Sequence, residues 1–280
     1  QYQFMGIDYI KKNEIYKHMA EKASKIVGFN VYETLNDEKL IHETRYTQPL
    51  VVLKTIFGYD MIQTLNPDIK AFLGFSLGEY SAYYAAKVFD LDSLLTVVSK
   101  RANFMDEETR LVKGMMVAVI GLDKSIVKGI CESLQSEGII DIANDNAPNQ
   151  YVISGEEALI LKAVSLLEDK GARRVIKLKT SGAFHTKLMD KASQKLVDEI
   201  NSNSTLTPQK TNKTIYMNLD AKPLDNNLIL DHITYQMTSE VKFRESIINM
   251  KKDGITHILE IGPGKVLTNL IKKIDPQLET

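Results

Sequence analysis

The amino-acid sequence predicts a mixed α/β protein in which a large subdomain with a parallel sheet is interrupted by a smaller insertion. One observation is a short apolar run, IKAFLGF, that meets a serine between glycines and is followed by a helical stretch. The other is a βαββαβ order of segments, the ferredoxin-like unit, within residues 114–182. We therefore expect residues 1–113 and 183–280 to form one discontinuous subdomain and residues 114–182 to form a ferredoxin-like inserted subdomain.

Length and composition fit a folded, water-soluble protein of this kind. The 280 residues are 44% hydrophobic and 25% charged, which argues against a disordered or disulfide-stapled chain. The net charge of -1 gives no overall field for nucleic acid or anionic membranes, and no window approaches the roughly 18 apolar residues of a membrane span. A single cysteine, Cys131, suits a reducing cytosol and is expected to be a buried small hydrophobe. We expect a cytoplasmic monomer that binds neither nucleic acid nor membrane.

In the first part of the chain, apolar residues recur at spacings of three and four, which indicates helices. Asp90 directly precedes one of these helices and is expected to cap it. The predicted elements are helices over 9–27 and 48–64, a buried strand over 68–75, and helices over 79–87 and 91–108.

The insertion and the last part of the chain continue the mixed pattern. The insertion is expected to contain strands 115–122, 139–145, 150–155 and 172–180, with helices 124–137 and 156–170 between them. The chain then returns to the large subdomain, with expected helices 188–201 and 228–238 and strands 214–218 and 257–262.

The motif at the end of the first predicted strand carries chemistry. Gly74 to Gly78 fits GxSxG and lies between a strand and a helix, the setting of the nucleophile elbow in α/β-hydrolase-like folds. Glycines on both sides allow a sharp turn that exposes the Ser76 hydroxyl, while the Leu77 N–H points toward a developing oxyanion. The large subdomain is therefore expected to be α/β-hydrolase-like, with Ser76 as its nucleophile.

A serine hydroxyl needs a base, and the five histidines of the chain are the first residues to consider. His18, His42, His232 and His257 occupy ordinary surface or capping positions. His185 follows a turn of small residues between a predicted strand and a helix, from which an imidazole could reach into a cleft. The alternative is that His185 only caps that helix.

Five segments together resemble one enzyme family. The segments GFSLGEYSA, KRANFM, ANDNAPNQYVISG, SGAFHTKLM and EIGPGKVLTNLIKKI are similar, in this order, to those of the malonyl-CoA:acyl carrier protein transacylases and related acyltransferase domains. The resemblance covers nearly the whole chain. It implies transfer of a malonyl group from malonyl-CoA to the phosphopantetheine thiol of an acyl carrier protein in fatty acid synthesis, through an ester on the serine. It implies neither a metal nor a redox cofactor.

The resemblance also implies roles for individual residues. Ser76 is the acyl-accepting nucleophile, His185 its base, and Arg101 the clamp for the malonyl carboxylate. A planar guanidinium offers a carboxylate two parallel hydrogen bonds that lysine cannot reproduce. From the residues alone, without the resemblance, a solvated helix arginine beside Lys100 is the favoured interpretation of Arg101.

Four more residues take their expected roles from the family. Gln236, in YQMTSEVKF, resembles the glutamine of a segment whose main-chain carbonyls orient the histidine, so that no acid is required. Phe184 resembles the position associated with an unbranched malonyl unit, although simple core packing would also place a phenylalanine there. Asn146 and Gln150 resemble polar lining of the cleft between the subdomains, although an asparagine in a turn has local reasons too.

The sequence departs from the family pattern in two places. Phe75 stands where family elbows usually have histidine, which affects fine positioning rather than the chemistry. Gln1 resembles the final residue of the turn after the family's first strand. We therefore expect that strand, with one oxyanion-hole N–H, to precede Gln1.

Three alternative functions compete with malonyl transfer. A discrete acyltransferase of a polyketide assembly line would use the same mechanism with another carrier. A serine hydrolase or thioesterase would place an acid between serine and histidine in the chain and would need no arginine at the acyl group. A catalytically dead binding module is disfavoured because Ser76 and His185 are both present. For docking an acidic carrier, the expected basic residues are Lys187, Lys191, Lys272 and Lys273.

Overall fold

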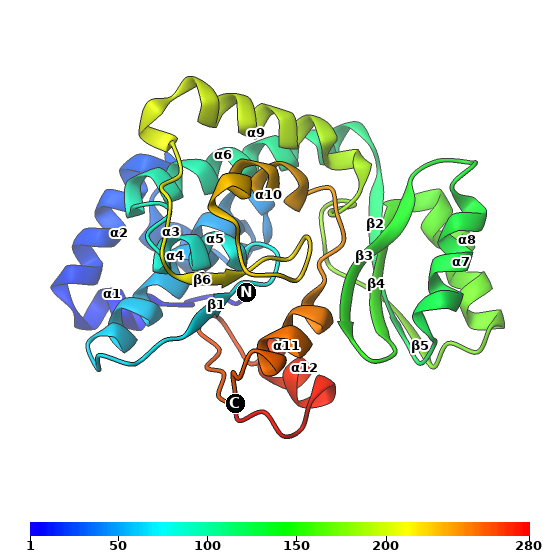
Figure 1. Cartoon of the computed structure of the whole chain (residues 1–280). Helices are drawn as coiled ribbons and strands as arrows, with labels where there is room; N and C mark the ends of the chain where they lie inside the picture. The colour runs from blue at the N-terminus through cyan, green and yellow to red at the C-terminus, as the bar shows by residue number, and fades with distance from the viewer.

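The computed structural model describes residues 1–280, in which a helix-rich body lies beside a smaller antiparallel sheet backed by two helices (Figure 1). The helix-rich body is the large subdomain and the sheet is the insertion. Before the insertion the large subdomain contains α1 Ile7–Lys12, α2 Glu14–Val27, α3 Val31–Asn36, α4 Thr44–Gln63, β1 Ala71–Leu73, α5 Gly78–Ala85 and α6 Leu91–Leu111. After it come α9 Asp190–Ser202, β6 Thr214–Tyr216, α10 Ile229–Gln236, α11 Phe243–Lys252 and α12 Val266–Ile274.

The N-terminal helices show where local chemistry overrides periodicity. The helix expected over 9–27 is divided at Asn13, whose backbone is extended and whose side chain accepts a hydrogen bond from Ile15 N at 2.9 Å. An asparagine cap thus starts α2 in the middle of a continuous apolar pattern. Asp90 caps α6 as expected, since its Oδ1 accepts from Ser93 N at 2.8 Å.

The parallel sheet of the large subdomain is small. β1 pairs only with β6, in parallel, and its residues line a cavity of about 1050 Å³. The prediction of a strand over 257–262 is wrong, because this segment forms only one isolated β-bridge, between His257 and Glu279. An extended apolar segment becomes a strand only beside a neighbour that satisfies its backbone groups. Residues of this segment and of β1 line the same cavity, and no backbone hydrogen bond joins the two.

The small subdomain has the expected ferredoxin-like order. It consists of β2 Gly114–Ile120, α7 Lys124–Leu134, β3 Ile140–Ala147, β4 Gln150–Glu156, α8 Glu157–Asp169 and β5 Arg174–Lys177. The strands lie in the antiparallel order β3-β4-β2-β5, and α7 and α8 cover one face over an apolar core (Figure 1). The opposite face turns toward the large subdomain, where Met116 and Val152 pack with Phe184. The predicted combination of a parallel sheet and an inserted antiparallel sheet is confirmed.

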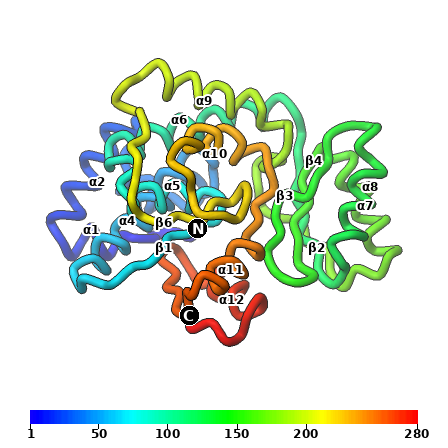
Figure 2. Tube along the Cα trace, in the orientation of Figure 1, coloured from blue at the N-terminus to red at the C-terminus, as the bar shows by residue number.

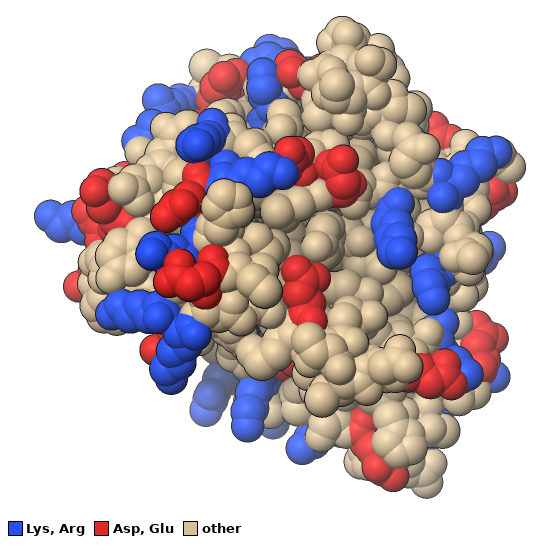
Figure 3. Space-filling view, turned by 90° about the vertical axis from the view of Figure 1, so that its left-hand side faces the viewer, with Lys and Arg blue, Asp and Glu red and all other residues tan.

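The core of the large subdomain holds the helices that carry the site. Buried side chains of α5, α6, α9, β6 and α10 form one continuous apolar cluster, and α1 to α4 form a second. Figure 2 shows α9 lying along α6 on the outside of this body. No helix has both the length and the apolarity needed to cross a membrane. On the face seen in Figure 3, acidic and basic side chains are intermingled, as the near-zero net charge leads one to expect.

Two expectations for single residues have different outcomes. Cys131 is a buried free thiol in the small-subdomain core, where burial raises its pKa to about 12, as expected for a small hydrophobe. The expectation that His232 lies at the surface is wrong. Its side chain is buried on α10, and this burial lowers its pKa. The apolar neighbours of α10 decide its burial, and they lie far away in the sequence.

Candidate active site

The nucleophile elbow forms between β1 and α5. Ser76 has φ 49°, a left-handed conformation that non-glycine residues rarely adopt and that concentrates at functional sites. Its Oγ lies 2.7 Å from His185 Nε2. The structure therefore places the serine and histidine singled out by the sequence in direct hydrogen-bonding contact.

The two glycines of the GxSxG motif differ in their structural roles. A Cβ on Gly74 would lie 2.0 Å from Glu79 N, so only glycine lets β1 pass so close to α5. Gly78 has ordinary helical backbone and open space around it. The expectation that both glycines are needed for the turn is therefore wrong for Gly78.

The elbow leaves one backbone donor unused beside the serine. Leu77 N donates to no protein acceptor, whereas the following amides of Gly78 and Glu79 bond back to Phe75 O and Ser76 O. The Leu77 N–H also lies at the N-terminal, positive end of α5. It is available to an oxyanion formed at an ester or thioester bound to the serine.

Two residues that the sequence did not reveal hold the elbow in place. Asn218 is buried, accepts a hydrogen bond from Ser76 N at 2.7 Å and donates to Gly74 O at 2.6 Å. Its own backbone N donates to Glu79 Oε2 at 2.8 Å. Burial raises the pKa of Glu79 to about 8, so this carboxyl is largely protonated at neutral pH. Asn218 follows β6 as Ser76 follows β1, and parallel strands bring their carboxyl ends together.

His185 is oriented by main-chain carbonyls. Its Nδ1 lies 3.0 Å from Gln236 O and 3.1 Å from Ser239 O, so Nδ1 carries the proton and Nε2 faces the serine hydroxyl. Burial, followed by the positive charge of Arg101, lowers the pKa of His185 to about 4. The imidazole is therefore neutral at physiological pH and able to accept a proton. Like the serine, it is left-handed, with φ 61°.

Arg101 projects from α6 into the interior and is only 2% exposed. It donates to Gln48 Oε1 and, at 3.0 Å, to Gln236 Oε1, and its guanidinium lies 5.2 Å from the centre of the Tyr80 ring. No carboxylate forms an ion pair with it, and burial lowers its pKa. The bland alternative, a solvated arginine, is thus wrong.

Gln236 connects these groups to one another. Its side-chain Nε2 donates to Ser76 O at 2.6 Å, its Oε1 accepts from Arg101, and its backbone carbonyl accepts from His185. Gln48 was not singled out by the sequence. The available signal was a glutamine at the start of an apolar helical run, which in the structure is buried against Arg101.

The remaining expected site residues lie apart from these contacts. Phe184 is half-buried and packs against both subdomains, which fits either of its two interpretations. Asn146 is buried in β3 rather than in a turn, and its Oδ1 has no partner. Gln150 begins β4 and accepts a hydrogen bond from Lys273 on α12 at 3.0 Å. Neither polar side chain contacts the serine, the histidine or the buried arginine.

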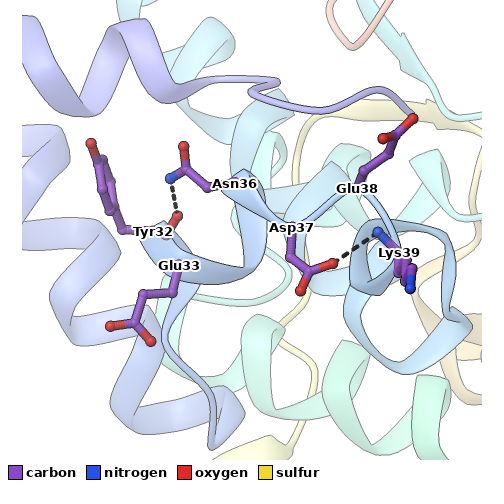
Figure 4. A pocket seen from close by; sticks show the side chains of 6 residues that line it. All are labelled: Tyr32, Glu33, Asn36, Asp37, Glu38 and Lys39. Carbon is purple, nitrogen blue, oxygen red and sulfur yellow. Dashed lines mark hydrogen bonds between the residues drawn. The ribbon is translucent and has the colours of Figure 1, made fainter.

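A second hollow, of about 590 Å³, lies at α3 and the turn after it (Figure 4). Its lining is mostly polar, and none of the residues of the serine site contributes to it. Local bonds such as Asn36 Nδ2 to Tyr32 O, at 2.7 Å, satisfy part of this lining. We assign it no function.

The fold and the serine site define the class of protein: the chain belongs to the acyl transferase domain family, whose family model matches residues 1–276. Similar curated proteins are the malonyl CoA-acyl carrier protein transacylases of Staphylococcus aureus, strain MSSA476 (35% identity, 97% of this chain, 88% of the relative), and Synechocystis (35%, 98% and 90%). Similar solved structures include the Streptococcus pneumoniae MCAT, with TM-score 0.93 and 34% identity, covering 100% of this chain and 91% of that one. A malonyl-transacylase bound to a type II PKS acyl-carrier protein matches with TM-score 0.93, 27% identity and the same coverage.

Proposed function

We propose that this protein transfers a malonyl group from malonyl-CoA to the phosphopantetheine thiol of an acyl carrier protein, supplying fatty acid synthesis. The observation that carries the proposal is the buried, positively charged Arg101, which has no carboxylate partner and is joined through Gln236 to the serine and histidine. A buried cation without a counter-charge is costly unless an anion binds to it. The free carboxylate of a malonyl group is such an anion, and the names of the relatives agree with it.

The first half-reaction forms an ester. His185 Nε2 accepts the Ser76 proton as Oγ attacks the thioester carbonyl, and the Leu77 N–H faces the resulting oxyanion. Collapse of the tetrahedral intermediate breaks the C–S bond, and the coenzyme A sulfur leaves with the proton from Nε2. The malonyl carboxylate meanwhile pairs with the guanidinium of Arg101.

The second half-reaction reverses these roles with a different thiol. His185 accepts the proton of the carrier's phosphopantetheine thiol, and the sulfur attacks the ester. The C–O bond to Ser76 breaks, and Oγ regains its proton from Nε2. Because two bulky thiols react in turn at one serine, the kinetics should be ping-pong.

Several finer points belong to the same proposal. The proposal includes a cytoplasmic monomer that uses no further cofactor. Every side chain invoked in the chemistry comes from one chain, and the coenzyme A thioester is itself the substrate. The same chemistry could serve a polyketide carrier, as in the type II PKS complex. A hydrolase is disfavoured because it has no need of the unpaired arginine beside the acyl group.

The test is intact-mass spectrometry of the protein with malonyl-CoA and then with a phosphopantetheinylated carrier protein. A malonyl adduct that persists in buffer and moves to the carrier supports the proposal. An adduct that water removes as fast as the carrier does would identify a hydrolase instead.

Arg101→Ala is expected to lower malonyl transfer by roughly ten- to a hundredfold, the value of a charge-assisted hydrogen bond, while sparing acetyl transfer. Arg101→Lys should restore only part of the loss, because lysine keeps the charge but not the paired geometry. The measurement is the ratio of kcat/KM for malonyl-CoA to that for acetyl-CoA in all three proteins. An equal loss for both substrates would make Arg101 a structural residue.

The rate of malonyl transfer to the carrier is expected to fall as the salt concentration rises, while the rate of acylation by malonyl-CoA changes less. Lys187, Lys191, Lys272 and Lys273 form no ion pair within the chain, so their charges are available to an acidic partner. Charge pairs across an interface steer association and are screened by ions. Lys191→Glu should slow the second half-reaction severalfold, and Lys128→Glu, at a lysine of α7 paired with Glu132, serves as the control. Equal salt dependence in all three proteins would rule out this docking face.

A further inference from the structure

Of the two carbonyls that orient His185, one belongs to Gln236, the last residue of α10, and the other to Ser239, in the segment that connects α10 to α11. This segment runs beside β3 of the small subdomain (Figure 1). Val241 N donates to Ala143 O at 2.8 Å, and Asp145 N donates to Val241 O at 3.0 Å. The orientation of the histidine in the large subdomain thus depends on a segment that is bonded to the small one.

An ionic cluster lies at the same junction. Arg244, at the start of α11, donates to Asp145 of β3 through both Nε, at 2.9 Å, and Nη2, at 2.8 Å. Lys124 Nζ lies 3.2 Å from the same carboxylate and 2.6 Å from Glu240 Oε1. Asp145 is only 3% exposed, so its charge depends on these partners rather than on water.

We propose that Asp145 and Arg244 are positioning residues for His185: their paired hydrogen bonds fasten the segment 237–241 to β3 and so keep the Ser239 carbonyl, and the Gln236 carbonyl directly before the segment, at Nδ1. The inference rests on the proposed function only in taking Ser76 and His185 as the reacting pair. It is independent of which acyl group is transferred.

A movement at this junction would displace groups that orient the His185 ring. His185 has no carboxylate partner, so the two carbonyls at Nδ1 and the Ser76 hydroxyl at Nε2 fix its ring, and Met237 O accepts a hydrogen bond from its backbone N. Breaking the Arg244 bonds leaves a buried carboxylate short of two donors, and the segment must move or admit water to solvate it. A displacement of about 1 Å at a catalytic group costs up to about a hundredfold in rate.

The same movement should change the acidity of the histidine. The charged group near His185 is Arg101 on α6, and the other groups facing it are the Ser76 hydroxyl and the two carbonyls. Because burial is the main cause of its low pKa, water entering along a loosened segment should raise that pKa toward its ordinary value. A residue that only stabilises the fold would lower the melting temperature without this shift.

The test uses a fluorophosphonate reagent, which labels an activated serine whatever the natural substrate. Labelling rates of the full chain are measured from pH 3.5 to 8 for the wild type, Arg244→Ala, Arg244→Lys and Asp145→Asn. We expect Arg244→Ala and Asp145→Asn to label about ten- to a hundredfold more slowly at pH 7. The acidic limb, which is the fall in labelling rate as His185 becomes protonated, should lie at higher pH in these variants than in the wild type. Arg244→Lys should recover part of the rate, since it keeps the charge without the second hydrogen bond.

Lys162→Ala, which removes an exposed ion pair with Glu137 in the same subdomain, is the matched control and should behave like the wild type. Wild-type rates and an unmoved acidic limb in folded Arg244→Ala would overturn the proposal. If Arg244→Ala fails to fold, Arg244→Lys and Asp145→Asn decide in the same way. Failure of malonyl transfer with intact fluorophosphonate labelling would refute the proposed function and leave this inference standing.

Discussion

Ser76→Ala is expected to remove all covalent malonyl adduct and all transfer to the carrier. The hydroxyl is the nucleophile of both half-reactions, and no neighbouring side chain replaces an oxygen that lies 2.7 Å from His185 Nε2. The measurement is intact-mass spectrometry after incubation with malonyl-CoA. A malonyl adduct of unchanged amount in the variant would falsify the assignment of the serine.

The substitution should leave the fold intact, which makes the result readable. The Ser76 backbone N keeps its bond to Asn218, and its carbonyl keeps the bond from Gln236. Alanine tolerates the left-handed backbone about as well as serine does. Thermal unfolding of the variant near the wild-type temperature is the control.

The parts of the fold that the sequence predicted are those governed by local pattern. Helical periodicity located α4 and α6 to within a few residues, and the strand–helix order revealed the whole small subdomain. The failures involve neighbours. The segment 257–262 has the composition of a strand but no partner across the cavity, and His232 is buried by side chains distant in the sequence.

The residues of the site also differ in whether the sequence could predict them. Ser76 lies in a local motif, His185 follows a turn of small residues, and the family resemblance pointed to Arg101 and Gln236; the structure joins all four through hydrogen bonds. Asn218, by contrast, acts by bridging backbone groups of the elbow across parallel strands, and its own sequence neighbourhood contains no motif. Such contacts arise only from the register of β1 against β6.

The two reacting residues, Ser76 and His185, both have strained backbones. Both occupy the left-handed region, which costs about 1 kcal/mol or more for each non-glycine residue. Buried hydrogen bonds hold each residue in this conformation. Asn218 and Gln236 provide them for the serine, and the carbonyls of Gln236 and Ser239 provide them for the histidine. The polar network therefore holds a geometry that the isolated turns would not keep.

His185→Ala should slow acylation of Ser76 by about a hundredfold or more, the low end of general-base contributions. The imidazole takes the serine proton and returns one to the leaving thiol, and no other titratable side chain bonds to Oγ. Rapid-quench measurement of the malonyl adduct gives the rate. Near-normal acylation by a well-folded variant would place the base elsewhere.

The pH dependence gives a sharper form of the same prediction. Burial and the charge of Arg101 lower the pKa of His185 to about 4, so its basic, neutral form persists well below the ordinary histidine value near 6.5. Wild-type acylation should stay level from neutral pH down to about pH 5 and fall as the pH drops through about 4, because the protonated ring cannot accept the serine proton. His185→Ala should lack this acidic limb. A wild-type limb near 6.5 would mean that the free enzyme exposes the ring to water, and the two carbonyls would then hold it less firmly than their distances of 3.0 and 3.1 Å indicate.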